Sequence, residues 1–327
     1  MATPQIPLDW LTPKTGSAHP EDARVVAAVA AATKFDTHLV PHPAHARTIA
    51  AFDRARLAGI AAGDGRRMAI SCLGPSGSGK TTAMRTFQRQ TAAGRPPVGR
   101  HPAEPVVIIQ VDNGCTNRRL WALVLEAHQD PPGKGTEETF RARAYATMRR
   151  AGTEMVIFDE VQHLLRSPNA RDVTDTIKRI LDDGVVTLGL VGTEQARPLL
   201  TRNIQLANRM LAPADLKPLD HRLDIDRKDF QAFVGQLDDA IINMNLMVER
   251  AGLDDQNIVR CLFVISGGVV GVVVNLLRQV LMHAVARGAN RIEPYDLSQI
   301  TDSWAIATGV CHVNPFRQML LRAGGAG

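Results

Sequence analysis

The sequence has few cysteines, few aromatic residues and no long apolar run, and each shortage excludes a class of protein. Its four cysteines lie far apart without a C-x-x-C pair, which argues against a zinc knuckle or a disulfide framework and favours a reducing, cytoplasmic location. Aromatic residues make up only 4%, so stacking on single-stranded nucleic acid is not indicated. The longest uncharged run, residues 261–277, is interrupted by glycines and is shorter than the ~20 residues of a membrane helix. We interpret this run as buried core and expect no membrane contact.

The remaining composition is that of a folded protein. Apolar residues make up 45% and charged residues 22%, and a length of 327 residues suggests two compact units. The net charge of +5 is too small for a polycation but is compatible with a locally basic face. The first 20 residues contain no apolar leader, so no signal peptide is expected.

Short apolar runs alternate with helical patterns up to about residue 219. The runs cover residues 68–73, 106–111, 155–158 and 185–191, and the helical patterns cover 44–60, 81–90, 120–127 and 173–181. This alternation predicts an α/β class with a mostly parallel sheet covered by helices on both faces.

Beyond residue 219 the apolar positions follow helical spacing instead. Helices are expected over about 230–244, 258–265, 269–287 and 294–305. The chain is therefore divided into an N-terminal arm that contacts a partner (1–45), an α/β core (46–219), an all-helical unit (220–312) and a C-terminal tail (313–327).

Residues 74–81 read Gly-Pro-Ser-Gly-Ser-Gly-Lys-Thr and match the phosphate-binding pattern G-x-x-x-x-G-K-[ST] between an expected strand and an expected helix. The backbone N–H groups of such a loop wrap a β-phosphate, and the next helix points its positive end at the anion. Lys80 is expected to reach the β- and γ-phosphate oxygens, and Thr81 to bind Mg²⁺. The expected nucleotide-binding residues are Gly74, Pro75, Ser76, Gly77, Ser78, Gly79, Lys80, Thr81 and Thr82.

Two acids end the apolar strand over residues 155–158. We expect Asp159 to hold Mg²⁺ beside Thr81, and Glu160 to act as the general base that polarises a water toward the γ-phosphate. Thr193 ends the fourth expected strand, where its hydroxyl can orient that water or cap the helix that follows. The two roles of Thr193 are compatible.

These motifs resemble those of the AAA+ ATPases, and narrower segments resemble the TniB/TnsC group of transposition regulators. The segments that carry the resemblance to this group are residues 38–43, 93–97, 105–109, 134–141, 154–160, 190–193 and 271–288, and those at 94–97 and 134–136 are the narrower ones. The resemblance covers about residues 40–310. It implies an AAA+ P-loop NTPase core followed by a small helical lid, with ATP and Mg²⁺ as cofactors.

The resemblance also implies that a neighbouring subunit supplies an arginine finger. Arg209 stands at the matching place, Arg202 is the competing candidate, and an ordinary arginine on a solvated helix is the alternative. The lid position of a second sensor arginine instead reads Gly271-Val272, and Arg278 lies two turns further on. This departure puts fast hydrolysis in doubt and favours nucleotide as an assembly switch.

The DNA-binding candidates are Arg118, Arg119, Lys134 and Thr136, in loops where AAA+ rings face their pore. Contacts from such residues to phosphate are largely independent of sequence. Ordinary solvated charges are the alternative for each residue. The N-terminal arm and the lid residues Arg287 and Arg291 are the other candidate surfaces.

The resulting hypothesis is an ATPase that forms a homo-oligomer, a ring or a helical filament, on duplex DNA. The resemblance implies that it recruits or regulates a DDE-type transposase with a TniQ-like target-selection adaptor, in the bacterial cytoplasm at the nucleoid. Two alternatives are a replication initiator or helicase-loader ATPase of the same fold, and a nucleotide-gated DNA scaffold that hardly hydrolyses.

Overall fold

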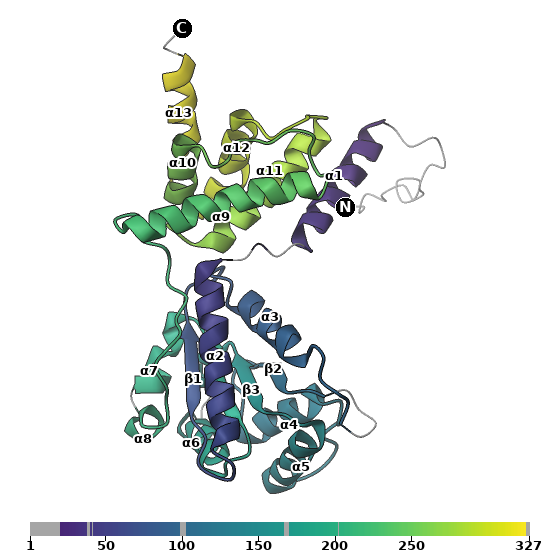
Figure 1. The fold of residues 1–327 in the computed structure, drawn as a ribbon, viewed down its shortest axis with the longest axis vertical. Helices are drawn as coiled ribbons and strands as arrows, with labels where there is room; N and C mark the ends of the chain where they lie inside the picture. The colour runs from purple at the N-terminus through teal and green to yellow at the C-terminus, as the bar shows by residue number, and fades with distance from the viewer. Residues whose placement is uncertain are drawn as a thin grey trace, which may run out of the picture. The chain divides into compact units, whose positions relative to one another are not determined.

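The computed structural model describes residues 20–37, 40, 42–98, 103–166, 170–201 and 203–324. The chain forms two compact units (Figure 1). The first contains the described residues of Met1–Val40, Val234–Cys261 and Val274–Gly327, and the second contains those of Pro41–Phe233 and Leu262–Val273. Each unit is therefore made of several separate segments of the sequence, unlike the consecutive domains that the sequence suggested. Arg202 and residues 1–19 of the expected arm lie outside the described residues.

A parallel four-stranded sheet forms the centre of the second unit, as predicted. Its strands are β1 (Ala69–Leu73), β2 (Val106–Gln110), β3 (Met155–Asp159) and β4 (Thr187–Gly192), in the order β1-β4-β3-β2. Every residue of β1, β3 and β4 is buried, which explains why these strands read as continuous apolar runs. Leu73 pairs with Gly192, and Gln110 pairs with Asp159, so the carboxyl ends of the strands meet at one edge.

A further extended segment lies along the outer side of β1. The N–H groups of Leu211, Ala214 and Leu216 donate to carbonyl oxygens of β1 at 2.7, 2.8 and 2.9 Å. The sequence pattern did not predict this segment, because Pro213 interrupts it and cannot donate a ladder hydrogen bond.

Helices cover both faces of the sheet (Figure 1). On one face Phe52 of α2 (Pro43–Ala61) and Phe87 of α3 (Lys80–Ala92) pack with Ile70 and Cys72 of β1. On the other face Ala69 and Leu73 of β1 belong to a core with the remaining helices. Those helices are α4 (Asn117–Ala127), α5 (Glu137–Ala151), α6 (Ala170–Asp182), α7 (Arg197–Thr201) and α8 (Ile204–Ala207), with the short 3₁₀ turns η2 (Val161–Arg166) and η3 (Glu194–Ala196).

The C-terminal third of the chain is helical, as expected. It contains α9 (Asp224–Asn243), α10 (Gln256–Ser266), α11 (Val270–Ala286), α12 (Pro294–Ile300), a π-helical turn η4 (Thr301–Ile306) and α13 (Pro315–Gly324). Among the described residues no single helix is long and apolar enough to cross a membrane, and the pair α10 and α11 passes that test only with a bend of 112° between them.

Two segments expected to be arm and tail contain helices. Residues Pro20–Asp36 form α1, which buries Ala28, Ala32 and Phe35. The Nζ of Lys34 donates to the carbonyl of Met244 at 2.6 Å, within the first unit. In the expected tail, Phe316 of α13 is fully buried. The described parts of both segments therefore belong to the packed structure.

Candidate nucleotide-binding site

The glycine-rich loop joins the end of β1 to the start of α3, as the sequence predicted. Gly77 and Gly79 have φ angles of 78° and 84°, which favour glycine. A Cβ on Gly74 would lie 2.2 Å from the carbonyl oxygen of Leu216, and one on Gly79 would lie 2.2 Å from Nε2 of His45. The backbone of Leu216 therefore requires glycine at position 74, and the ring of His45 leaves no room for a side chain at position 79. Pro75 is half-buried, whereas Ser76, Gly77 and Thr82 are exposed at the mouth of the loop.

Lys80 is folded back over this loop. Its Nζ donates to the carbonyl oxygens of Gly74 and Pro75 at 2.9 and 2.7 Å, and the residue is 7% exposed. Burial lowers the pKa of Lys80. Nζ also lies 3.5 Å from the hydroxyl oxygen of Ser78, so its partners are all neutral oxygens, which it can exchange for the oxygens of a phosphate.

The two residues expected to bind Mg²⁺ are in contact. The hydroxyl of Thr81 donates to Oδ2 of Asp159 at 3.0 Å, and Asp159 is 5% exposed. Hydroxyl and carboxylate oxygens are the ligands that Mg²⁺ prefers, and this ion usually takes only one or two protein ligands beside phosphates and water. The described residues contain no group of three His, Cys, Asp or Glu side chains that could hold a metal by themselves. The pair therefore fits Mg²⁺ bound together with a nucleotide.

Glu160 follows Asp159 in a left-handed backbone conformation, with φ of 60°. Its N–H donates to Oδ1 of Asp159 at 2.9 Å. Its carboxylate accepts a hydrogen bond from Nε2 of Gln162, whose Oε1 accepts the N–H of Thr193 at 3.0 Å. Gln162 could not be recognised from the sequence, because nothing in the local pattern shows that its amide joins the ends of β3 and β4.

Thr193 precedes η3 but its side chain makes no capping hydrogen bond. Its Oγ1 is buried and has no partner among the described residues. The capping role is therefore not realised by the hydroxyl, which leaves it available to a ligand.

Arg209 lies at the opposite edge of the sheet from the glycine-rich loop. Its carbonyl accepts the N–H of Ala69, at the start of β1. Its guanidinium forms two hydrogen bonds with Asp182, at 2.9 and 2.8 Å, and these bonds lower the pKa of Asp182. Because the glycine-rich loop follows the other end of β1, the described structure does not bring Arg209 to this loop.

Gly271, at the lid position that lacks an arginine, contacts the glycine-rich loop through its backbone. The N–H of Gly271 donates to the carbonyl of Gly77 at 2.9 Å, and a Cβ on Gly271 would lie 2.1 Å from that oxygen. Arg278 instead pairs with Asp36, with 3.0 Å between Nε and Oδ2.

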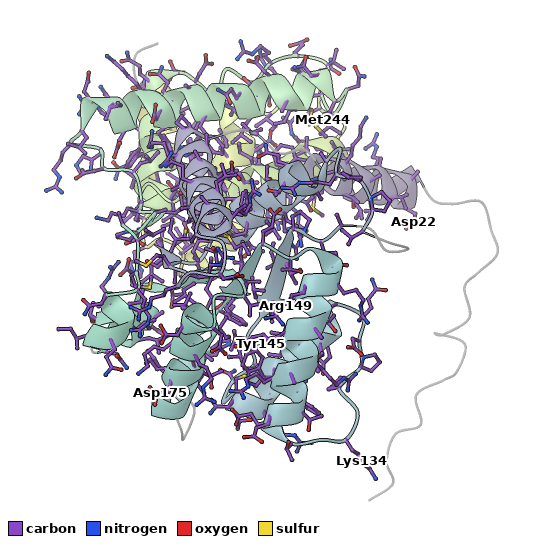
Figure 2. All side chains as sticks on the ribbon, turned by 60° about the horizontal axis from the view of Figure 1, so that its bottom comes forward. Asp22, Lys134, Tyr145, Arg149, Asp175 and Met244 are labelled. Atoms are coloured by element: carbon purple, nitrogen blue, oxygen red, sulfur yellow. The ribbon has the colours of Figure 1, made fainter. Side chains whose placement is uncertain are left out.

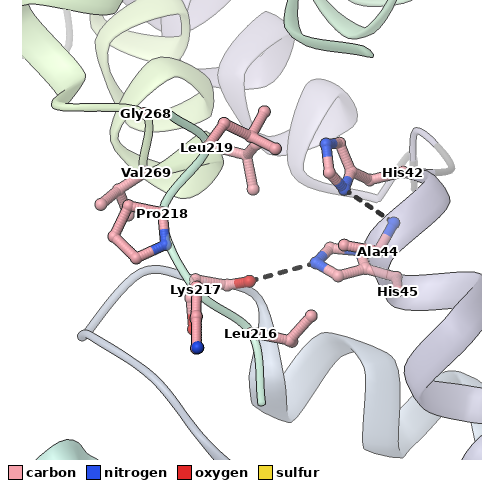
Figure 3. Close-up of a pocket in the computed structure, with 11 residues that line it drawn as sticks. His42, Ala44, His45, Leu216, Lys217, Pro218, Leu219, Gly268 and Val269 are labelled. Carbon is pink, nitrogen blue, oxygen red and sulfur yellow. Dashed lines mark hydrogen bonds between the residues drawn. The ribbon is translucent and has the colours of Figure 1, made fainter. Parts of the chain in front are cut away.

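A pocket opens beside the glycine-rich loop, within the second unit (Figure 3). His42, His45 and Ser78 line it together with residues 216–219 and 268–270. Nε2 of His45 lies 3.1 Å from the carbonyl oxygen of Ser78, and Nε2 of His42 is buried without a partner among the described residues. Burial lowers the pKa of His45, and burial followed by repulsion from His45 lowers the pKa of His42 to about 4. Both imidazoles are therefore neutral at pH 7.

The four expected DNA-binding residues differ in their contacts with other side chains. Lys134 is exposed at the tip of the loop before α5 (Figure 2). The guanidinium of Arg118 lies 5.1 Å from the ring centroid of Phe140. Arg119 forms ion pairs with Asp112 and Glu126, each at 2.6 Å. Thr136 caps α5 by accepting the N–H of Thr139.

Both alternative cations in the lid, Arg287 and Arg291, form ion pairs. Arg287 forms ion pairs with Asp296 at 2.7 Å and with Glu293 at 2.8 Å. Arg291 is 3.9 Å from Glu249. Of the cations considered, Lys134 is the one whose charge is least compensated among the described residues.

The parallel sheet, the glycine-rich loop after its first strand and the acids at the end of β3 define an AAA+ P-loop ATPase fold. Two similar solved structures are the Orc1 protein of Aeropyrum pernix in complex with DNA and Cdc6p from Pyrobaculum aerophilum. The first is 16% identical with a TM-score of 0.57, and the alignment covers 81% of this chain and 66% of that chain. The second is 15% identical with a TM-score of 0.58, and the alignment covers 83% and 70%.

A sequence model of the bacterial TniB protein matches residues 38–219, more than half of the chain. The chain belongs to the TniB family. A comparison with curated proteins gives no match.

Proposed function

We propose that this chain is an ATP- and Mg²⁺-dependent ATPase that assembles on duplex DNA and regulates a transposase. The observation that carries the proposal is the contact of Thr81 with Asp159 beside Lys80, at the edge where the strands end. These side chains supply a phosphate-binding cation and a pair of hard oxygen ligands in one place.

The residues take complementary roles around the phosphates. Lys80 exchanges the carbonyl oxygens of the loop for β- and γ-phosphate oxygens, and Thr81 and Asp159 hold Mg²⁺. The bound ion supplies positive charge that stabilises the transferring phosphoryl group. Glu160 accepts the proton of the attacking water, and the free hydroxyl of Thr193 orients that water or the γ-phosphate.

The pocket beside the loop is our proposed site for the base of the nucleotide. Ser78 of the loop lines this pocket, so the base of a nucleotide whose phosphates lie in the loop can enter it. Leu216, Pro218 and Val269 offer apolar contacts, and the unpartnered Nε2 of His42 can pair with a polar edge of the base.

The position of Arg209 supports a proposal of oligomerisation. Since it lies away from its own phosphate loop, we propose that it reaches the γ-phosphate of a neighbouring subunit as an arginine finger. Nucleotide binding and assembly into a ring or helical filament are then linked equilibria. Phosphate contacts from Lys134 and Arg118 would be largely independent of DNA sequence.

The partners and location are proposed from the family. A DDE-type transposase, a TniQ-like adaptor and a place at the nucleoid in the bacterial cytoplasm are the expectations that membership of the TniB family supports. A nucleotide-gated scaffold with little hydrolysis is the second candidate, and the contact of Gly271 at the lid position favours it.

The experiment is electron microscopy of the full chain with duplex DNA and either a non-hydrolysable ATP analogue or ADP. The proposal expects regular oligomers on DNA with the analogue and none with ADP. The Lys80→Ala variant is the matched control, and it is expected to form none in either case. Oligomers that form equally well with ADP and with the analogue would contradict the proposal.

A further inference from the structure

Gln162 connects Glu160 to Thr193, and Thr193 lies 31 residues after Gln162 in the chain. It lies in η2, directly after β3, and is 6% exposed. Its Nε2 donates to Oε2 of Glu160, and its Oε1 accepts the N–H of Thr193 at 3.0 Å. A single buried amide therefore joins the expected general base to the backbone at the end of β4.

The two partners fix the orientation of this amide. A carboxylate only accepts hydrogen bonds, and a backbone N–H only donates. A flipped amide would place its oxygen against the carboxylate of Glu160 and its NH₂ group against the N–H of Thr193. The amide consequently adopts a single orientation in this link.

The backbone at Gly192 and at Glu160 has unusual features beside this link. A Cβ on Gly192 would lie 2.5 Å from Oε1 of Gln162 and 3.1 Å from Cγ2 of Val161, so this position has no room for a side chain. Glu160 takes a left-handed conformation that is uncommon outside glycine, asparagine and aspartate. Its Oε1 accepts no hydrogen bond from the described residues, so one carboxylate oxygen is held and the other is available to a water.

We propose that Gln162 is a positioning residue that holds the carboxylate of Glu160 and the backbone of Thr193 as one unit. The inference rests on the proposed ATPase function. The hydroxyl of Thr193, which has no partner among the described residues, is the group of this unit that a γ-phosphate would contact. Because Gln162 binds both residues, the carboxylate of Glu160 keeps a fixed position relative to Thr193. Gln162 thus sets the rate of the chemical step without touching the nucleotide.

The test is steady-state ATP hydrolysis by the Gln162→Glu variant of the full chain with duplex DNA. Glutamate keeps an acceptor for Thr193 but removes the donor to Glu160 and places a second negative charge against it. Displacing a general base costs at least ~10-fold in kcat, and we expect KM for ATP to change by less than about threefold because no phosphate-binding group is altered. The exposed Gln236→Glu change on α9 adds the same charge and should leave kcat unchanged.

The Gly192→Ala variant reaches the link by another route. Its Cβ displaces Oε1 of Gln162, so the same loss of kcat with little change in KM is expected. Thermal unfolding midpoints identify variants that are simply misfolded, and ATP binding by each variant confirms an intact loop. A folded Gln162→Glu variant with wild-type kcat overturns the inference, as does a loss that appears only as a raised KM.

Failure of the inference is distinguishable from failure of the proposed function. Glu160→Gln removes the base itself and should stop turnover whatever Gln162 does. If Glu160→Gln is inactive and Gln162→Glu is fully active, the ATPase assignment holds and the positioning role of Gln162 is wrong. If Glu160→Gln turns over at the wild-type rate, the assignment of Glu160 as base is wrong, and the inference is overturned with it.

Discussion

Single residues at the nucleotide site could be predicted from the sequence where a motif fixes the chemistry. Lys80, Thr81, Asp159 and Glu160 could be singled out because the motif specifies their types and order, and the structure brings Thr81 and Asp159 into contact. Gln162 could not be found, because its two partners come together only through the register of β3 and β4. The ion pair of Arg209 with Asp182 was hidden for the same reason, since it joins the ends of separate elements.

Lys80→Ala should abolish tight ATP binding. The loop loses its only mobile cation against the β- and γ-phosphate charge, and we expect the dissociation constant for ATP to rise at least ~100-fold. Fluorescence titration with a labelled ATP analogue measures this change. Unaltered affinity in a variant with a normal unfolding midpoint would refute the phosphate-loop assignment.

His42 should make the protein sensitive to acid. Its pKa is lowered from 6.5 to about 4, so below pH 6.5 the unfolded chain binds the proton more readily than the folded one. Stability is therefore full above pH 6.5 and is lost as the pH falls toward 4. The loss at pH 5 is about 2 kcal/mol.

The measurement compares unfolding midpoints at pH 7.5 and pH 5.0 without nucleotide. His42→Gln should shrink the difference between the two midpoints. The same change at the exposed His312 should leave the difference as in the wild type. If the midpoint falls equally from pH 7.5 to pH 5.0 in the wild type and in His42→Gln, His42 is not the group that causes the acid sensitivity.

Elements were predicted well where burial makes the pattern strong. The parallel strands are continuous apolar runs because both faces of the sheet are covered. Helix α1 was missed because its buried face consists mainly of small residues such as Ala28 and Ala32, which give no clear apolar stripe. The pocket at His42 and His45 was missed because it arises from the packing of α2 against the phosphate loop.

The start of α11 should control the shape of the phosphate loop. Gly271→Ala places a Cβ 2.1 Å from the carbonyl oxygen of Gly77, so the loop or the helix must shift. We expect ATP affinity to fall at least ~10-fold, since an ångström-scale misplacement of a binding group has effects of this size. Isothermal titration measures the affinity.

Gly235→Ala is the matched control for this change. Its Cβ would meet only ordinary contacts, with Asp254 Cβ at 3.5 Å, and ATP affinity should stay as in the wild type. Unchanged affinity in Gly271→Ala would show that the loop does not depend on α11.

At the scale of the whole molecule, the sequence supported a fold and a family but not an assembly. The TniB match and the AAA+ fold agree with the resemblance read from the motifs. The boundaries of the compact units could not be read from chain order, because α9, α10 and α11 each contribute to both units. The number of basic residues likewise does not show which of them are free to bind DNA, because Arg119 and Arg287 form ion pairs with acidic residues.

The DNA surface should be visible in the salt dependence of binding. Replacing Lys134 and Arg118 with alanine should weaken duplex binding equally on unrelated sequences. The slope of log K against log salt should flatten by up to ~0.9 for each lost phosphate contact. Arg119→Ala should change the slope least, because its charge is already paired. An unaltered slope in the double variant would move the DNA site elsewhere.

The central claim is that the described site hydrolyses ATP, and phosphate release tests it most directly. The measurement is steady-state phosphate release from ATP and Mg²⁺ by wild type and Glu160→Gln, each with and without duplex DNA. The account predicts turnover by the wild type that duplex DNA increases, and at least ~100-fold less in Glu160→Gln with ATP binding retained. No turnover by the wild type, or equal turnover by both proteins, would contradict it.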